Sequence, residues 1–249
     1  MKISIITATY NSEKTIQHAL DSVRSQDYQD IEHIIVDGAS SDRTSDIVRA
    51  NSNERVQFYS EPDQGIYDAL NKGINHANGD VVGILHSDDF FADNSIISQV
   101  AESFAQNNID AVYGDLDYVD KEDPTQVVRS WKSEAYHERL FYRGWMPAHP
   151  TFFAKKECFE KFGLYDLSFF TSADYELMLR FILRHKIKTQ YLPATMVKMR
   201  VGGQSNVTLR NRIIANREDA RAWKVNNLKP RLYTRWLKPL SKVMQFVKV

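Results

Sequence analysis

Two adjacent carboxylates, Asp88 and Asp89, follow the apolar run of residues 81–85. The turn formers Asn78-Gly79-Asp80 precede that run, which predicts a buried strand with both acids at its carboxyl end. Open α/β sheets bind their ligands at that end of the strands. Neighbouring carboxylates repel each other, and a hard divalent cation relieves the repulsion, with a nucleotide diphosphate supplying its remaining ligands. The pair therefore predicts a cation site, and a solvated turn is the alternative.

Further acids occupy comparable places along the chain. Asp37 follows the strand predicted at residues 34–36, and Asp174 lies in the first turn of a helix that opens at Ser172, where the helix dipole favours a negative charge. Together these carboxylates indicate a cleft for a metal and a polar ligand. The chain has no dinucleotide loop, no phosphate-binding loop and no Cys or His at zinc spacing, which argues against dehydrogenases, ordinary NTPases and zinc enzymes.

The elements that would position these acids alternate between strand and helix. Strands are predicted at residues 3–8, 34–36, 56–59 and 81–85, and amphipathic helices lie between them. Strands at 111–119 and 126–131 should form a hairpin, and helices are predicted through 97–104, at 155–162 and from 172. Strand-helix alternation is typical of a parallel sheet with right-handed crossovers. The predicted fold class is therefore α/β, with a mostly parallel central sheet flanked by helices.

Charge divides the 249 residues into two unlike parts. The net charge is zero, yet residues 221–249 hold eight Lys or Arg and no acid, which leaves 24 basic against 32 acidic side chains in residues 1–220. We therefore predict a catalytic domain at 1–220 and a basic helical extension at 221–249. Apolar residues of the extension recur at helical spacing from Arg231, and Pro239 would kink that helix.

The extension and the composition also bear on location. The single cysteine, Cys158, excludes an internal disulfide framework and fits a reducing compartment. No signal-peptide pattern or run of about 20 apolar residues is present, so we expect a cytoplasmic protein. A basic amphipathic segment suits the inner face of an anionic membrane, with packing on the catalytic domain or on a second subunit as the alternative. We expect no binding to nucleic acid, because no recognition motif accompanies the basic residues.

The chain resembles the family 2 glycosyltransferases in five segments that occur in the expected order. The segments are Thr9-Tyr10-Asn11, residues 36–44, residues 61–73, Ser87-Asp88-Asp89 and Ala173-Asp174-Tyr175-Glu176. It looks like the branch that builds bacterial surface polysaccharides, such as the colanic-acid type. The resemblance implies a GT-A fold, a nucleotide-sugar donor, a Mn²⁺ or Mg²⁺ cofactor and inversion at the anomeric centre.

The same resemblance implies roles for the acids after the central strand. Asp89 would be a metal ligand, and Asp88 would bind metal or lie nearer the donor sugar. The family's usual Asp-x-Asp begins with Ser87 here. A literal Asp115-Leu116-Asp117 also occurs, and we interpret it as a decoy within a strand.

Several residues match positions that bind the donor in relatives. Tyr10 would stack on the base, unless it is a core tyrosine, and Asp37 would contact the base, although the second acid of the family's pair is Gly38 here. A UDP-sugar is therefore favoured, and GDP- and dTDP-sugars stay open. Lys72 would offset diphosphate charge, with a solvent-facing lysine as the alternative. The full donor-binding set is Thr9, Tyr10, Asn11, Asp37, Asp68, Asn71, Lys72 and Asp88.

On the acceptor side, Asp174 matches the family's base, with a helix-capping carboxylate as the alternative. His149, Trp145 and Gln204 are expected to face the acceptor, a saccharide that is free or lipid-linked. His149 could instead be a buried structural histidine. The competing function is a catalytically degenerate family member that acts as a scaffold for polysaccharide assembly.

Overall fold

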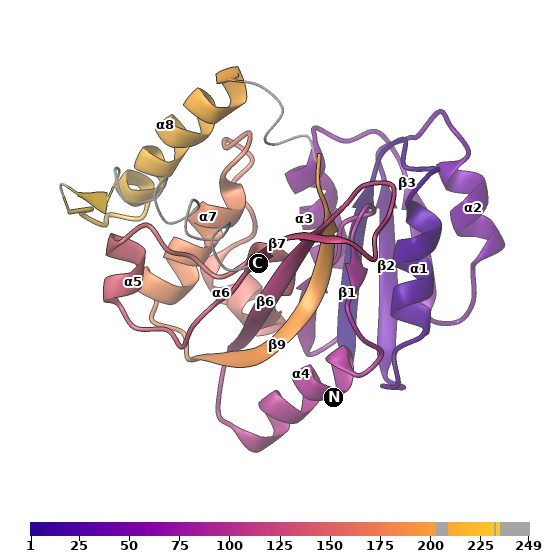
Figure 1. Cartoon of the computed structure of the whole chain (residues 1–249), viewed down its shortest axis with the longest axis horizontal. Helices are drawn as coiled ribbons and strands as arrows, with labels where there is room; N and C mark the ends of the chain where they lie inside the picture. The colour runs from indigo at the N-terminus through magenta and orange to yellow at the C-terminus, as the bar shows by residue number, and fades with distance from the viewer. Residues whose placement is uncertain (203–208, 232, 235–249) are drawn as a thin grey trace.

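The computed structural model describes residues 1–202, 209–231, 233 and 234 (Figure 1). Within this part of the chain, nine strands form one sheet in the order β3-β2-β1-β4-β8-β6-β9-β5, and β7 pairs with β6 beside that path. The strands are β1 (Ile3–Thr9), β2 (Ile31–Asp37), β3 (Val56–Ser60), β4 (Val81–Ile84), β5 (Phe90–Phe91), β6 (Ala111–Val119), β7 (Val127–Trp131), β8 (Phe153–Lys155) and β9 (Thr189–Arg200).

The first half of the sheet is parallel, as predicted. β1 pairs in parallel with both β2 and β4, and β2 pairs in parallel with β3. Every residue of β1 and β2 is buried, because helices cover both faces of this half. The helices that connect its strands are α1 (Ile16–Arg24), α2 (Thr44–Ala50) and α3 (Ile66–His76).

The two faces of the parallel half have different covers. Leu70 and Ile74 of α3 pack in one cluster with Ile6 and Ile34. Ala19 and Val23 of α1 pack with Ile3, Ile5 and residues of α4 (Ile96–Gln106) on the opposite face. Alternate residues of β1 thus point to α3 and to α1, as the period of two in a strand requires.

The second half of the sheet is mixed, so the prediction of parallel pairing does not extend to it. β8 is antiparallel to β4 and to β6, β5 is antiparallel to β9, and β6 is parallel to β9. β6 and β7 form the predicted hairpin. A Cβ at Gly83 of β4 would lie 2.2 Å from Cε1 of Phe153, so this junction of the two halves requires glycine.

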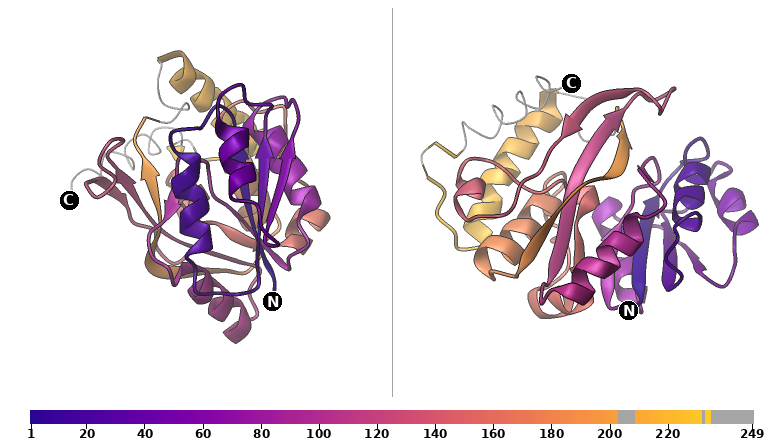
Figure 2. Two further views of the ribbon diagram at one scale, coloured as in Figure 1. Left: turned by 90° about the vertical axis from the view of Figure 1, so that its right-hand side faces the viewer. Right: turned by 60° about the horizontal axis from the view of Figure 1, so that its bottom comes forward.

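Helices of the C-terminal half gather on one side of the molecule (Figures 1 and 2). They are α5 (Arg139–Tyr142), the short η1 (His149–Thr151), α6 (Lys156–Phe162), α7 (Ala173–Met178), the π-helical η2 (Leu179–Arg184) and α8 (Leu209–Val225). α8 runs across the boundary predicted at 220/221, and Ala222 and Trp223 are buried in the main core. Residues 235–249 of the basic extension lie outside the described residues. No helix of the described part is long and apolar enough to cross a membrane.

Candidate active site

Parallel pairing brings the chemistry-bearing loops to one edge of the sheet. Thr9, the last residue of β1, is paired with Asp37, the last residue of β2. Ile6 is paired with Ile84, the last residue of β4, so the loop with Asp88 and Asp89 leaves the sheet beside Tyr10. This common edge is the place where α/β sheets bind ligands.

Asp89 is a fully buried carboxylate, and neither of its oxygens has a hydrogen-bond partner among the described residues. Burial raises the pKa of Asp89 well above its usual value, and the charge of Asp88 raises it further, whereas the backbone N–H and the charge of Arg200 offset only part of this rise. An ionised carboxylate in such a place is stable only beside a cation, so the pair fits the implied Mn²⁺ or Mg²⁺. No group of three or more His, Cys, Asp or Glu that could hold a metal ion occurs in the described part of the chain.

Arg200, the last residue of β9, holds the turn that carries these acids. Its guanidinium donates to the carbonyl oxygen of Asp88 at 2.5 Å and lies 2.6 Å from Nδ1 of His18. Burial, together with the charge of Arg200, lowers the pKa of His18, so the neutral imidazole accepts this hydrogen bond. His18 in turn stacks on Phe90 at 4.0 Å between ring centroids. Sequence reasoning missed Arg200, because it lies 112 residues after Asp88 in the chain and only folding brings the two together.

Asp174, whose side chain is 19% exposed, lies between two partners. His149 Nδ1 is 3.2 Å from Asp174 Oδ2, and the hydroxyl of Tyr67 donates to Asp174 Oδ1 at 3.4 Å. Burial and the charge of Asp174 raise the pKa of Tyr67, so its hydroxyl keeps the proton that it donates. The predicted base and His149 are therefore together, and Tyr67 is a neighbour that the sequence did not indicate.

Two side chains connect the region of Asp174 with the acids after β4. Burial and His149 lower the pKa of His86 to about 4, while Asp88 and Asp174 both act against this shift. Burial raises the pKa of Tyr118 on β6, and both Asp89 and Asp174 add to the rise. Both carboxylates are therefore close enough to this phenol to influence its pKa.

Tyr118 also has a cationic neighbour from the hairpin. The guanidinium of Arg129 on β7 lies 3.7 Å from the centroid of the Tyr118 ring, and its charge and hydrogen bond lower the pKa of this tyrosine. No sequence pattern indicates this pair, because their contact depends on the register of β6 and β7.

Of the residues expected around the base, Tyr10 is exposed and Asp37 is enclosed. The Tyr10 side chain is 60% exposed at the sheet edge. Asp37 is fully buried and accepts hydrogen bonds from the hydroxyls of Ser45 and Ser60 and from the backbone of Ser40. The oxygens of Asp37 are thus buried and hold the loop after β2, and its contact with the base stays a prediction.

Asp63 takes the place beside Tyr10 that we expected for Asp37. Oδ2 of Asp63 lies 2.5 Å from the position that a Cβ on Gly38 would have, and that position is 3.4 Å from the Tyr10 ring. Oδ1 of Asp63 accepts from the Gly65 backbone at 2.8 Å. The absent second acid at position 38 was the available sequence signal for a carboxylate supplied from elsewhere.

Thr9 and Asn11 shape the loops around Tyr10. Asn11, at a φ of 50°, accepts from the Ser41 backbone at 2.9 Å, and its own backbone N–H donates to Ser40 Oγ at 2.8 Å. The Thr9 hydroxyl is buried and has no partner among the described residues. The Thr9 side chain is thus buried, whereas Asn11 is exposed and binds the loop after β2 through its side-chain oxygen.

The three donor-binding residues predicted on α3 are engaged with protein groups. Lys72 Nζ lies 2.8 Å from Glu61 and 3.5 Å from Asp68, and Asp68 also accepts from the backbone of Gln64 at 3.0 Å. Asn71 binds the backbone N–H and carbonyl of Tyr165, each at 2.9 Å. In this structure the three side chains bind neighbouring protein groups next to the site.

Two residues predicted on the acceptor side remain, Trp145 and Gln204. Trp145 packs against an aromatic group formed by Tyr113, Tyr136 and Phe141. Gln204 lies outside the described residues.

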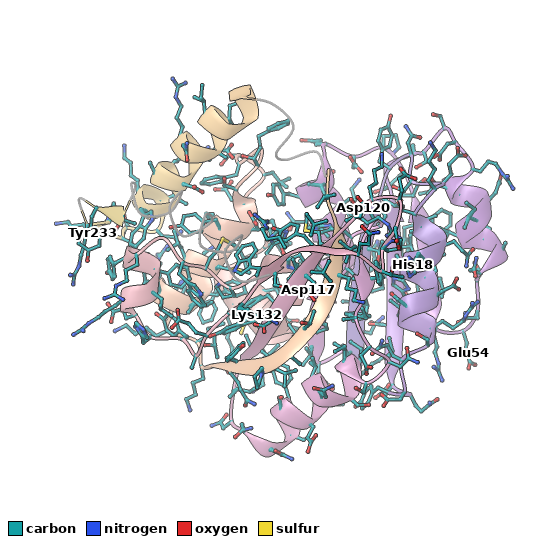
Figure 3. The ribbon with its side chains drawn as sticks, viewed as in Figure 1. His18, Glu54, Asp117, Asp120, Lys132 and Tyr233 are labelled. Carbon is teal, nitrogen blue, oxygen red and sulfur yellow. The ribbon has the colours of Figure 1, made fainter. Side chains whose placement is uncertain are left out.

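The literal Asp-x-Asp lies on the hairpin side of the sheet, where Figure 3 labels Asp117 and Lys132. Asp115 is buried, lies 3.1 Å from Lys132 Nζ and accepts from the hydroxyl of Tyr191 at 2.9 Å. Asp117 accepts from the Ser130 hydroxyl at 2.6 Å. These bonds support the interpretation of this motif as a decoy.

The comparison with protein families decides the class. Residues 4–180 match the family model described as glycosyl transferase family 2. The chain belongs to this family. Its match contains the acids after β4, the loop around Tyr10 and the proposed base, and ends before β9 and α8.

Curated relatives and solved structures agree with this class. The chain is 33% identical over 180 residues to an uncharacterized glycosyltransferase of Mycobacterium tuberculosis, covering 72% of this chain and 68% of the relative. It is 29% identical over 212 residues to a PGL/p-HBAD biosynthesis glycosyltransferase of Mycobacterium bovis, covering 82% and 78%.

The structures that resemble this one are of GT-A type. The fold matches S. aureus TarS in complex with UDP-GlcNAc at a TM-score of 0.69 and 18% identity, covering 100% of this chain and 73% of TarS. It matches the mannosyltransferase PcManGT of Pyrobaculum calidifontis, in complex with GDP-Man and Mn²⁺, at a TM-score of 0.68 and 19% identity, covering 97% and 73%. The predicted GT-A fold is confirmed.

Proposed function

We propose that this family 2 glycosyltransferase moves a sugar, a hexose or an N-acetylhexosamine, from a nucleotide diphosphate to a saccharide hydroxyl, with inversion at the anomeric carbon. The observation that carries the proposal is the pair formed by Asp89 and Asp174. Asp89 is buried without a protein partner, Asp174 is partly exposed beside His149, and both act on Tyr118. Asp89 suits the binding of a cation, and Asp174 suits the acceptance of a proton.

The reaction that fits this arrangement is a single displacement. The acceptor oxygen attacks C1 of the donor sugar from the face opposite the diphosphate, the C1–O bond to the diphosphate breaks, and the hydroxyl proton passes to Asp174. Tyr67 and His149 hold the Asp174 carboxylate at its two oxygens during this transfer. A divalent cation held by Asp89 and Asp88 would neutralise charge on the leaving diphosphate.

The donor nucleotide is proposed from the surroundings of Tyr10. An exposed aromatic ring stacks on any base, whereas a carboxylate oxygen accepts only from an N–H group on the base edge. Oδ2 of Asp63 lies near the Tyr10 ring, which supports such a contact with the base edge. One accepting oxygen fits the single N3–H of uracil, so a UDP-sugar is favoured over GDP-sugars; a dTDP-sugar has the same donor group.

The acceptor and the location follow from the relatives and from the basic extension. One relative is named a PGL/p-HBAD biosynthesis glycosyltransferase, which supports a biosynthetic role, and we propose a saccharide or lipid-linked acceptor in surface polysaccharide assembly. Residues 221–249 hold eight basic side chains and no acid, which suits contact with the inner face of an anionic cytoplasmic membrane.

The deciding experiment measures nucleotide-sugar turnover with and without Mn²⁺ or Mg²⁺. We expect metal-dependent release of the nucleoside diphosphate and loss of about 100- to 10,000-fold in rate for Asp174→Asn. The variant should still gain thermal stability from UDP and Mn²⁺, because its donor side is intact. Glu157→Asn, an exposed carboxylate on α6, is the control and should turn over like wild type.

Two results would contradict the proposal. Asp174→Asn with most of its turnover would refute the role of the base. Absence of turnover with UDP-, GDP- and dTDP-sugars, while the protein binds a polysaccharide-assembly partner, would instead favour the scaffold function.

A further inference from the structure

Helix α8 binds the segment that leads into the base-bearing helix α7. The carboxylate of Glu218, only 9% exposed, accepts from three consecutive backbone N–H groups, those of Phe170 at 2.6 Å, Thr171 at 2.8 Å and Ser172 at 3.0 Å. The Thr171 hydroxyl donates to the same carboxylate at 2.8 Å. This carboxylate thus accepts hydrogen bonds from the three backbone N–H groups that immediately precede α7.

Arg221, less than one turn further along α8, holds the beginning of the same segment. Its guanidinium donates to the carbonyl oxygen of Ser168 at 2.9 Å and lies 4.4 Å from the centroid of the Phe169 ring. Phe169 is buried in the main core. The loop of residues 168–172 is therefore fastened at both of its ends by α8.

Two further residues of α8 and its end reach the helix itself. Nε1 of Trp223 donates to the hydroxyl of Tyr175 at 2.9 Å, and the amide of Asn226 donates to Oε1 of Glu176 at 3.0 Å. Trp223 and Asn226 are both buried. Contacts from α8 thus lie before and after Asp174 in the chain.

These contacts matter because α7 contains only six α-helical residues. α7 continues directly into η2, and its first turn, which carries Asp174 at the free end of this helix, depends on packing for its orientation. Tyr67 and His149 contact the Asp174 carboxylate itself, and α8, a helix beyond residue 180 where the family match ends, restrains the backbone that carries it.

We propose that Glu218 is a positioning residue for the glycosyl transfer, which fixes the loop before α7 and thereby the orientation of Asp174. This inference rests on the proposed function, in which Asp174 is the base. Glu218 itself touches neither donor nor acceptor in this account. It acts through three backbone groups and one hydroxyl.

The chemistry of the contact defines the sharpest variant. A carboxylate offers only acceptors, whereas the amide of glutamine has the same shape and carries two N–H donors. In Glu218→Gln, an N–H group of the glutamine therefore faces the backbone N–H groups of the loop, or some of those groups lose their acceptor. The matched control is Glu157→Gln, which makes the same chemical change on an exposed turn of α6.

The first experiment measures amide hydrogen exchange in the full chain and does not depend on the reaction. Glu218→Gln should accelerate exchange at residues 170–178 by tenfold or more, by an order-of-magnitude expectation for a lost local restraint. Exchange in β1–β4 should stay as in wild type, and Glu157→Gln should change neither region. Unchanged exchange at 170–178 would overturn the proposed restraint.

The second experiment measures kcat and KM with the nucleotide sugar that wild type turns over. For Glu218→Gln we expect kcat to fall by about 10- to 100-fold, because small misplacement of a catalytic group costs this much, with donor KM within about twofold. In the Asp174→Asn background, Glu218→Gln should cause no further fall, since the group that it positions is gone. An equal fall in both backgrounds, or an effect on donor KM alone, would overturn the positioning role.

The two experiments separate this inference from the proposed function. Absence of turnover in wild type would count against the transferase proposal, whereas the exchange result would still decide whether Glu218 restrains α7. If Glu218→Gln does not fold, Arg221→Gln replaces it, because Arg221 restrains the same loop from a more exposed position. It should show the same pattern with a smaller change, and wild-type exchange and kcat would contradict the proposal.

Discussion

At the scale of single residues, the burial of Asp89 without a partner has a measurable cost. Its folded-state pKa is raised, so the folded chain holds this proton more tightly than the unfolded chain does. Stability is therefore lost as pH rises above the unfolded value of about 4. A cation at this carboxylate would restore it by binding only the folded state.

Asp89→Asn should accordingly stabilise the metal-free protein. We expect a gain of about 1–3 kcal/mol in the free energy of unfolding at pH 7, which disappears below about pH 4, where wild-type Asp89 is protonated in both states. The stabilisation that UDP and Mn²⁺ give to wild type should vanish in the variant. Urea unfolding at both pH values checks this, and a variant that keeps the Mn²⁺ effect would exclude Asp89 as a ligand.

The carboxylate beside Tyr10 gives a second prediction at this scale. Asp63→Ala should weaken binding of UDP about tenfold, because the N3–H of uracil loses its acceptor. Gly38→Asp should also weaken binding, since its side chain collides with Asp63, and the double variant Gly38→Asp/Asp63→Ala should recover part of the affinity.

Calorimetric titration with UDP and Mn²⁺ measures all three variants, with Asp46→Ala on the exposed side of α2 as the control. Wild-type affinity in Asp63→Ala would show that another residue reads the base.

The residue types of the site were predictable where the chain itself places them at a strand end or helix start. This holds for Asp88, Asp89 and Asp174. Tyr118 and Arg200 contact the site only through strand pairing in the second half of the sheet, which no local pattern encodes. Asp37 and Asn71 were predicted as donor contacts, but nearby hydrogen-bond partners engage them first.

At the scale of elements, β4 and β8 are closely packed where the two halves of the sheet meet. The Phe153 ring occupies the space above Gly83. Gly83→Ala should destabilise the fold by about 1–3 kcal/mol, because the added methyl must displace a fully buried ring. The urea midpoint measures this loss, and an unchanged midpoint would mean that β8 shifts without cost.

Some elements of this fold could be predicted from the sequence, and others could not. The parallel half follows from apolar runs that alternate with amphipathic helices, and the β6–β7 hairpin follows from strands close in sequence. The mixed half depends on β6 pairing with β9, whose first paired residues, Ala111 and Thr189, are distant in the chain. β5 has only two residues, too few for a periodic signal.

At the scale of the whole molecule, the catalytic body extends beyond the change in charge at residue 220. Truncation to residues 1–220 removes Ala222, Trp223 and Asn226, all buried, and should cost about 3–5 kcal/mol of stability, the value for loss of a large core side chain. Truncation to 1–234 keeps them and should melt like the full chain.

Binding to vesicles tests the rest of the extension with the same pair of chains. The 1–234 chain should lose affinity for anionic vesicles, because it lacks the basic residues from Arg235 onward. Tyr233, which precedes them, lies at the opposite end of the molecule from Glu54 (Figure 3). Equal flotation of 1–234 and the full chain would contradict membrane contact through the extension.

The position of α8 also sets an order of events during synthesis. The strands that carry Asp89 are complete once about the first third of the chain has emerged, whereas α7 acquires its partners Glu218 and Asn226 only near the end of translation. At about 5–20 residues per second, roughly ten seconds separate the two. Because the turn of Asp88 and Asp89 also needs Arg200, a nascent chain completes the surroundings of both carboxylates only in the last fifth of its synthesis.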